Sequence, residues 1–350
     1  MKKKLLAAAV VGALASPVAI GQTLYGIVDL GYQNAKHADG DVNKHFMVQG
    51  QHSGSRLGVR GSEDLAGGTY AMYQIEFNIV ADDGSAAGTG TQRLTFVGLG
   101  SKAWGELTLG RQYTHQFHTI AVGSAAAYAT FASNAGQIPE LTRASDSIKY
   151  SSPVMGGFAV GVLWGLSGAA SGSASGANEP TAVGVDADYW DAAVRYTPGP
   201  FGVALGYGKL ETSAAGVDTE NTSVQLSANW DNRAFGIYAN YWQDETEVGP
   251  TTTRDGDVWS ISGVARFGGR HELYALFGQG DDDAITVADA KHRFWAVVYQ
   301  HVMSKRTRLY TGIAKVKNEP ASAMVPTAFA APVAAGYDPR GFQLGLVHTF

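Results

Sequence analysis

The sequence lacks several features that would point to a soluble or nucleic-acid-binding protein. It contains no cysteine, so no disulfide framework holds the chain together. Only 16% of its 350 residues are charged, and the formal net charge is −5. This acidic balance argues against nucleic acid as a partner. After Gln22 no apolar run approaches the roughly 20 residues that a membrane helix needs, so we expect no helical span.

The first 21 residues have the composition of an export signal. Three lysines after Met1 are followed by the apolar core Leu5–Ala15, which is too short for a membrane helix. Small residues then stand at the two positions that suit cleavage before Gln22. We therefore predict a signal peptide at 1–21 and a mature chain at 22–350. A buried N-terminal helix is the alternative.

Runs of about ten residues that alternate between apolar and small or polar side chains dominate the mature chain. Phe158, Val160 and Val162, for example, alternate with Ala159 and Gly161. Such a strand presents one face to lipid and the other to water, and the strands must close because hydrocarbon tolerates no free edge. The pattern predicts an all-β fold, a transmembrane antiparallel β-barrel over 22–350. A soluble β-sandwich, whose strands also alternate, is the alternative.

About 16 strands are expected, joined by tight turns at one end of the barrel and by longer loops at the other. We predict strands at 24–36, 45–60, 69–78, 93–99, 105–112, 147–152, 158–166, 189–196, 201–210, 222–230, 234–243, 257–267, 271–278, 294–302, 308–316 and 341–350. The low-complexity loops 167–185 and 320–339 are expected to be exposed and mobile. Aromatic residues near strand ends are expected to form the membrane-interface girdles, namely Trp164, Trp230, Trp242, Trp259, Tyr196 and Tyr299.

The stretch Tyr113–Arg143 lies between two predicted strands and has no strong periodic pattern of its own. It is long and rich in Ala, Gly and Ser. A loop much longer than about 12–15 residues is normally either functional or disordered. We predict that it folds into the barrel lumen and narrows the pore as a constriction loop. Glu140 is its main acidic candidate for the pore constriction.

Inward-facing charges are the other candidates for the constriction, because charged rings at the narrowest point set the selectivity of a pore. Arg56, Arg93 and Arg143 share the parity of small or polar neighbours, so we expect them to point inward. Asp29, on the first strand, is a further acidic candidate. The alternative is that these residues are lumen charges unrelated to the constriction.

Arg111 follows a different pattern from the other arginines. It shares the parity of Leu107 and Leu109, so we expect it to face outward, into a subunit interface. An arginine facing lipid near the midplane would cost roughly 2–4 kcal/mol, so it needs a protein partner. Glu76 and Glu106 are candidates for that partner.

Seven stretches spread along the chain form a recognisable set by their order and spacing. They are Thr23–Asp29, Ser55–Leu65, Phe96–Leu99, Gly105–Gln112, Ile148–Pro153, Met303–Thr307 and Gly345–Phe350. Together they resemble the general porins of Gram-negative outer membranes, in particular the β-proteobacterial trimeric type. These porins are 16-stranded barrels that assemble as homotrimers in the outer membrane, among lipid and lipopolysaccharide, and pass small hydrophilic solutes by diffusion. The resemblance implies the same fold, assembly, location and function here.

The resemblance also implies residue roles. In the family, arginines at the places matching Arg56, Arg93 and Arg143 form a basic cluster on the wall that faces the loop. Related loops often carry Pro-Glu-Phe-Gly, whereas Leu141 follows Pro-Glu here. A terminal aromatic residue that closes an alternating strand, here Phe350, is the signal for the barrel assembly machinery. Several cations against one or two carboxylates predict a moderate anion preference, although the whole chain is acidic.

Two other functions stay open. One is a substrate-selective channel with a binding site for a particular anion or organic acid. The other is a barrel enzyme, such as an outer-membrane phospholipase or protease. The sequence contains no Gly-x-Ser-x-Gly elbow, P-loop or His-Glu-x-x-His, so we expect neither an enzyme nor a cofactor.

No metal site is expected either. The acidic run Asp281–Asp283, with Asp289 beyond it, lacks the Gly and Glu of an EF-hand, and the histidines show no ligand spacing. The run is interpreted as a solvated outer loop. Its carboxylates could bridge lipopolysaccharide through divalent ions.

Overall fold

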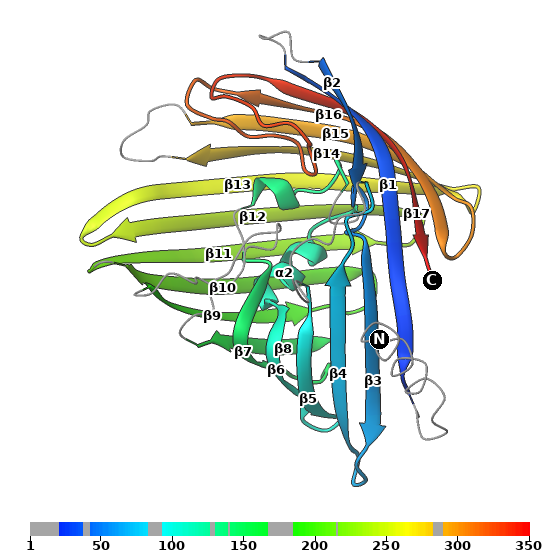
Figure 1. The fold of residues 1–350 in the computed structure, drawn as a ribbon, viewed down its shortest axis with the longest axis vertical. Helices are drawn as coiled ribbons and strands as arrows, with labels where there is room; N and C mark the ends of the chain where they lie inside the picture. Colours follow the sequence, from blue (N-terminus) through cyan, green and yellow to red (C-terminus); the bar gives the residue numbers. More distant parts are fainter. Residues whose placement is uncertain are drawn as a thin grey trace, which may run out of the picture.

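We analysed a computed structural model of the protein, shown in Figure 1. It describes residues 21–37, 43–82, 93–126, 130–138, 141–166, 185–214, 216–282 and 290–350. The predicted signal peptide, residue 140 and most of the loop at 167–185 therefore lie outside the described residues. Within the described ranges, no helix is long and apolar enough to cross a membrane.

Most of the described chain is β-strand, because the alternating segments pair with their neighbours in sequence. The constriction loop, residues 114–142, adds the short helix α2 (His115–Val122) and the 3-10 turn η1 (Ala135–Gln137). The strands are β1 (Thr23–His37), β2 (Asn43–Gln49), β3 (Arg56–Asp64), β4 (Thr69–Asn78), β5 (Thr95–Ser101), β6 (Gly105–Tyr113), β7 (Arg143–Ser151), β8 (Phe158–Gly165), β9 (Val185–Tyr196), β10 (Phe201–Ala214), β11 (Val217–Asp231), β12 (Phe235–Val248), β13 (Thr251–Phe267), β14 (His271–Asp282), β15 (His292–Val302), β16 (Thr307–Asn318) and β17 (Pro339–Thr349).

The strands form one antiparallel sheet that closes on itself. Apart from β2 and β3, each strand pairs with its sequence neighbours, and β1 pairs with β17 from Ile27↔Thr349 to His37↔Pro339. Both β2 and β3 pair with β1, so together they fill one strand position of the barrel, which is interrupted at residues 50–55. The 17 strands of the described chain thus make a 16-stranded barrel when β2 and β3 are counted as one strand, which confirms the predicted fold.

Closure at the chain end depends on one glycine. The backbone N–H groups of Gly26 and Phe350 each donate to the other residue's carbonyl at 3.1 Å. The Phe350 ring lies so close that a Cβ on Gly26 would come within 2.3 Å of its Cζ. Only glycine at position 26 therefore leaves room for the terminal aromatic ring.

The two faces of the wall follow the predicted alternation over most of the barrel. Val160 and Leu226 point outward and are about half exposed, at 49% and 48%, whereas the inward-facing Ser223 and Gln225 are buried. Trp164 and Trp230 are also on the outer surface, as predicted for girdle residues. The prediction for Trp242 was wrong, because its side chain is 1% exposed and points inward.

Three strands on one side of the barrel are longer than predicted. β11 begins at Val217, β12 ends at Val248, and β13 begins at Thr251, so their paired ends extend well past the predicted limits. Residues in these extensions, such as Glu245 and Arg254, are polar on both faces. Alternation of hydrophobicity carries no signal there, although backbone pairing continues through the register Glu245↔Asp255.

The constriction loop folds into the lumen, as predicted. Figure 1 shows α2 inside the ring of strands, and it contacts β8, β9, β10 and β11. Further along the loop, the Ala125 N–H donates to Ser262 Oγ at 3.1 Å and Asn134 Nδ2 donates to Ser260 Oγ at 3.0 Å. The loop therefore crosses the lumen from β6 to the inner face of β13.

The last long loop, residues 320–339, was predicted to be exposed and mobile. The exposure was wrong for its middle part, which packs inside the barrel, and the mobility stays a prediction. Gln33 Nε2 donates to the Ala328 carbonyl at 2.8 Å, and the Ala330 N–H donates back to Gln33 Oε1 at 2.6 Å. Thr327 is buried and bonds to the constriction loop through Gly136 N–H and the Ser133 carbonyl. Its small side chains allow this close packing inside the barrel.

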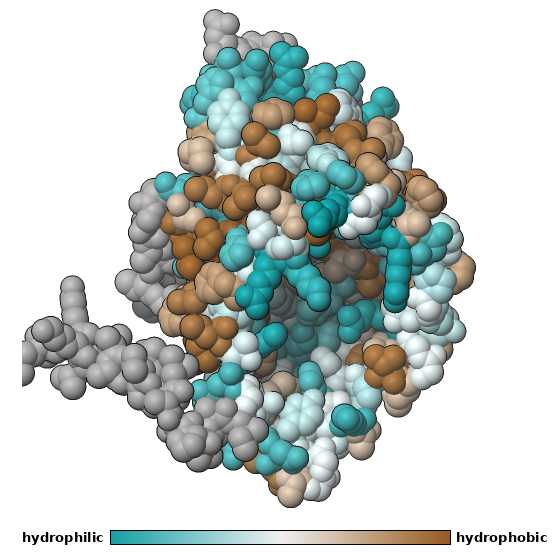
Figure 2. All heavy atoms as spheres, turned by 90° about the vertical axis from the view of Figure 1, so that its right-hand side faces the viewer, coloured by the Kyte–Doolittle hydropathy of each residue, from teal (hydrophilic) through white to brown (hydrophobic). Residues whose placement is uncertain are grey.

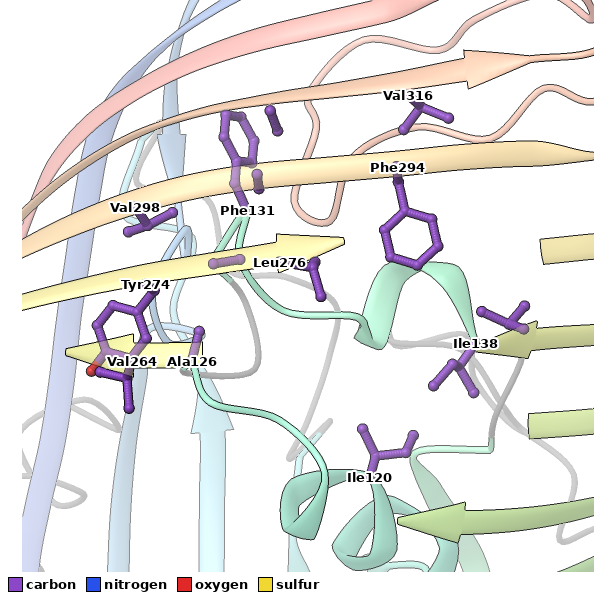
Figure 3. Packing of buried hydrophobic residues seen from close by; sticks show 14 of the residues in the cluster. Ile120, Ala126, Phe131, Ile138, Val264, Tyr274, Leu276, Phe294, Val298 and Val316 are labelled. Carbon is purple, nitrogen blue, oxygen red and sulfur yellow. The ribbon is translucent and has the colours of Figure 1, made fainter. Parts of the chain in front are cut away.

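A hydrophobic core fills one side of the lumen. The alternation of the strands predicted that their inner faces meet water, so this core was not expected. Figure 3 shows Ile120, Phe131 and Ile138 of the constriction loop packed among side chains of the wall. The inward residues of β12 to β16 are apolar here because they face these loop residues rather than water. The wall members of this lumen core are Trp242, Val258, Val264, Tyr274, Leu276, Phe294, Ala296, Val298, Ala314 and Val316.

Candidate functional site: the pore constriction

Three arginines surround Tyr113 at the point where the constriction loop leaves the wall. Arg93 Nη2 and Arg143 Nη2 donate to the Tyr113 hydroxyl at 2.8 and 3.1 Å. The Arg143 guanidinium also lies over the Tyr113 ring, 4.7 Å from its centroid. Arg56 acts electrostatically on the same tyrosine. The three residues come from the starts of β3, β5 and β7, so the fold brings together charges that are far apart in sequence.

Glu76 on β4 holds two of these arginines. Arg93 Nε donates to Glu76 Oε1 at 2.6 Å, and Arg56 Nη1 lies 3.8 Å from Glu76 Oε2. The Tyr25 hydroxyl donates to the same carboxylate at 3.0 Å. Glu76 is only 2% exposed, so its charge is matched by neighbours rather than by water. Three guanidinium groups against this one carboxylate leave the cluster with a net charge of two positive.

The interruption between β2 and β3 orients Arg56. The chain at residues 50–55 turns inward, and Arg56 Nε donates to the Gly54 carbonyl at 2.8 Å while Nη2 donates to Ser53 Oγ at 2.9 Å. A Cβ on Gly54 would lie 3.0 Å from Arg93 Nη1, so the absence of a side chain lets Arg93 approach. The interruption therefore positions two members of the arginine cluster.

Asp29 fixes this interruption rather than facing the pore. Its Oδ2 accepts the N–H groups of His52 and Ser53 at 2.6 and 2.8 Å, and its Oδ1 accepts the Tyr310 hydroxyl at 2.7 Å. The side chain points inward, as the strand parity predicts, but residues 50–55 cover it and it is 0% exposed. Asp29 thus supports the constriction through the backbone that carries Arg56.

We expect Asp29→Asn to weaken the constriction without unfolding the barrel. An amide in place of the carboxylate loses charge-assisted hydrogen bonds, each of which contributes about 1.5–3 kcal/mol. Residues 50–55 should then loosen, so that single-channel current becomes noisier and the preference between anions and cations falls. Asp218→Asn is the matched control, because Asp218 is exposed on β11. An unchanged current trace for Asp29→Asn would contradict this role.

The N-terminus of α2 is held against the wall by a buried carboxylate. Asp191 Oδ2 accepts the N–H groups of His115 and Gln116 at 2.7 and 3.2 Å, and the Tyr189 hydroxyl at 3.1 Å. Thr114 caps the same helix by accepting the Phe117 N–H at 3.1 Å. Negative charge near the first free N–H groups of a helix is favourable. The first turn of α2 is therefore attached to the inner face of β9.

The other predicted site residues lie elsewhere or outside the described chain. Glu140 is outside the described residues. Arg111 pairs with Thr95, two positions along from the outward-facing pair Val97 and Leu109, so it has the outward parity. Its Nη1 donates to Ser145 Oγ at 2.8 Å. Its suggested partners are engaged with other groups, because Glu76 binds the arginine cluster and Glu106 accepts the Tyr70 hydroxyl at 2.9 Å.

Sequence reasoning missed Tyr113 and the true role of Glu76. Parity alone could have found Glu76, because it alternates with the outward-facing Ile75 and Phe77 and therefore points inward. Tyr113 gives no such signal, because the strand β6 has an irregular register between Gly110 and Gln112. That irregularity shifts the side-chain parity just before the loop begins.

The resulting lumen has two unlike sides. The arginine cluster occupies the wall of β3 to β7, and the lumen core fills the wall of β12 to β16. Figure 2 shows a hollow bordered by hydrophilic side chains, with hydrophobic residues farther out on the same face. The basic residues of the lumen thus lie on one side of the wall, and its apolar residues lie on the other.

A closed barrel with an apolar outer face and a narrowed polar lumen defines a channel protein that spans a membrane with strands. Comparison with known families places it more closely, since residues 6–321 match the model described as Gram-negative porin. The chain therefore belongs to the Gram-negative porin family. It forms a water-filled channel through the outer membrane, as a multi-pass β-barrel protein.

Individual relatives match this chain over most or all of its length. The chain is 32% identical over 378 residues to the outer membrane porin protein 32 of Delftia acidovorans, with 100% of both chains covered. Among solved structures, it is similar to an anion-selective porin from Comamonas acidovorans, at 26% identity and a TM-score of 0.75, covering 94% of this chain and 99% of that one. OmpT of Vibrio cholerae in its trimer form shares the fold, with a TM-score of 0.70, 15% identity, and coverage of 94% and 99%.

Proposed function

We propose that this porin is a moderately anion-selective diffusion channel whose selectivity resides in Arg56, Arg93 and Arg143. The observation that carries the proposal is the cluster of three guanidinium groups around Tyr113, opposed by one buried carboxylate. A focused positive field at a narrow passage attracts anions regardless of the net charge of the whole chain. The similar porin from Comamonas acidovorans is described as anion-selective, which supports the same assignment.

The transported solutes are small and hydrophilic, and passage is passive. In support, the lumen is polar and basic on one side and apolar on the side of the lumen core, and the described residues contain no group of three or more side chains suited to hold a metal ion. The members of the matched family are porins, which favours a channel over an enzyme. Glu140 is proposed as the acidic residue of the constriction loop.

The zero-current potential of the purified channel in a potassium chloride gradient tests the selectivity. We expect a potential of the sign set by chloride, because chloride is attracted to the arginine cluster and potassium is repelled. A potential of the potassium sign would overturn the proposal. A conductance that saturates with one particular organic acid would favour the substrate-selective alternative.

We further propose that the mature chain, residues 22–350, is a homotrimer after removal of a signal peptide at 1–21. Support for assembly comes from the trimer form of the structurally similar OmpT and from the outward position of Arg111. Phe350 is proposed as the signal for the barrel assembly machinery, and the surrounding surface as the contact with outer-membrane lipid and lipopolysaccharide. Chemical crosslinking in detergent is expected to stop at a three-chain product, and a monomer only would contradict this assembly.

A further inference from the structure

A second basic recess lies in the lumen beyond the arginine cluster, toward the short turns. It has a volume of about 540 Å³ and is bounded by α2, the turn between β5 and β6, and the strands β7 and β9. Three cations line it, namely Lys102, Lys149 and Arg195, together with the single carboxylate Glu106. Sites for small ligands typically have volumes of about 300–1,000 Å³. This recess, the short-turn pocket, is therefore large enough for a small solute and a few waters.

Of the three cations of the short-turn pocket, Lys149 donates to the Tyr113 carbonyl at 2.8 Å, so Lys102 and Arg195 are the two that can turn toward a ligand. In the part of the chain that the structure describes, none of the three has a carboxylate within ion-pair distance. Glu106 accepts the Tyr70 hydroxyl at 2.9 Å and keeps its negative charge, so three cations against one carboxylate leave the lining with a net charge of two positive. Uncompensated cations that converge on one recess attract an anion with more than one charge.

Neutral donors complete the lining. His115 and His118 of α2 face the pocket, and burial together with the nearby Lys149 lowers the pKa of each to about 3. Both rings are therefore uncharged near neutral pH, and a neutral imidazole carries one N–H donor. His115 donates its one N–H from Nε2 to the Tyr150 carbonyl at 3.0 Å, so its ring is held in place and does not itself donate to a ligand. Serine hydroxyls at 101, 151 and 152 also line the pocket.

One tyrosine joins the pocket to the arginine cluster. The Tyr113 hydroxyl accepts Arg93 and Arg143, whereas its backbone carbonyl accepts Lys149 Nζ at 2.8 Å. The two basic groups therefore lie on opposite ends of the same residue. Rapid conduction through a selective pore needs several weak sites in sequence, so that an ion can leave one as it enters the next.

We propose that the short-turn pocket is a second anion-binding station that takes small doubly charged oxyanions, such as phosphate or a short dicarboxylate. Arg195 and Lys102 supply the charge, and Lys149 positions the ligand next to Tyr113. The proposal rests on the anion selectivity proposed above, because the ligand shares the path past the arginine cluster.

Block of chloride current by a dianion tests the pocket. Wild-type channels in potassium chloride at about pH 8, where phosphate groups are mostly doubly charged, are titrated with inorganic phosphate or with succinate. We expect current to fall to a saturating level with either ion. In Lys102→Gln with Arg195→Gln, the half-blocking concentration should rise about tenfold or more, as lost charge-assisted contacts predict. Lys102→Arg with Arg195→Lys should restore tight block.

Controls separate this proposal from the selectivity itself. Arg270→Gln with Arg306→Gln removes the same charge from exposed short turns outside the pocket and should leave the block unchanged. The zero-current potential of the pocket variant should keep the chloride sign, because the arginine cluster is intact. Chloride selectivity without saturable block, or block that the pocket variant leaves unchanged, would overturn the pocket and leave the proposed function standing. Saturation by only one ion identifies phosphate or carboxylate as the preferred headgroup.

Discussion

Replacing Arg56 and Arg143 together by glutamine is expected to lower the chloride-over-potassium permeability ratio about tenfold or more. The two substitutions remove the net positive charge of the cluster and leave the Arg93–Glu76 pair in place. A unit charge about 4 Å from a passing ion contributes about 1 kcal/mol in water, and about 1.4 kcal/mol changes a ratio tenfold. The zero-current potential in a salt gradient measures the effect directly.

The choice of these two arginines follows from the partners of the third. Arg93 is 2.6 Å from the buried Glu76, and removing one member of a buried pair costs about 3–5 kcal/mol because the other charge is left uncompensated. Arg93→Gln would therefore mix a change in folding with a change in selectivity. Arg233→Gln with Arg270→Gln removes the same formal charge from exposed turns and serves as the control. A double cluster variant with the permeability ratio of the wild type would remove these arginines from the constriction.

Replacing Phe131 by alanine is expected to release the constriction loop and enlarge the pore. Phe131 is 1% exposed and packs against Gly341 of β17. A Cβ added to Gly341 would lie only 2.7 Å from Phe131 Cζ. Loss of a buried phenylalanine side chain costs about 3–5 kcal/mol. Loops commonly open at a lower free-energy cost than the strands around them, so we expect a loss of this size to free the loop before the wall unfolds. Single-channel conductance should rise and fluctuate while the barrel remains folded.

A lipid-facing residue provides the comparison for Phe131. Ile261 on β13 is 52% exposed on the outer surface, so Ile261→Ala removes apolar atoms without touching the loop. Its conductance should equal that of the wild type. Heat-resistant β-sheet circular dichroism of both variants would establish that the wall is intact. Wild-type conductance in Phe131→Ala would show that the lumen core does not anchor the loop.

The wall of the barrel was predictable because lipid imposes a strict alternation on each strand. Val160 and Leu226 are on the outer face for that reason, and parity also placed Arg56 and Arg143 inside. Arg93 points inward although it shares the parity of the outward-facing Val97 and Leu99, because it precedes the start of β5 at Thr95. Prediction failed where lipid is absent. The extensions of β12 and β13 carry polar residues on both faces, so their pairing left no periodic trace.

The interior depends on contacts between distant segments, which periodicity does not contain. Trp242 and Phe294 look like lipid-facing residues in sequence, yet they pack on the constriction loop. Asp29 resembles a pore charge, but residues 50–55 turn inward and bury it. Glu76 was visible as an inward carboxylate, whereas its pairing with Arg93 required the register of β4 on β5.

The central claim is that water and ions pass only along the arginine side of the lumen, because loops and apolar side chains fill the other side. The absence of cysteine makes single-cysteine variants clean probes of this claim. The decisive measurement is the reaction rate of a negatively charged thiol reagent with Arg56→Cys and with Val298→Cys in conducting channels. The arrangement of charges and the 0% exposure of Val298 predict rapid modification with loss of chloride current at position 56 and none at position 298. Equal rates at the two positions, or faster reaction at 298, would contradict it.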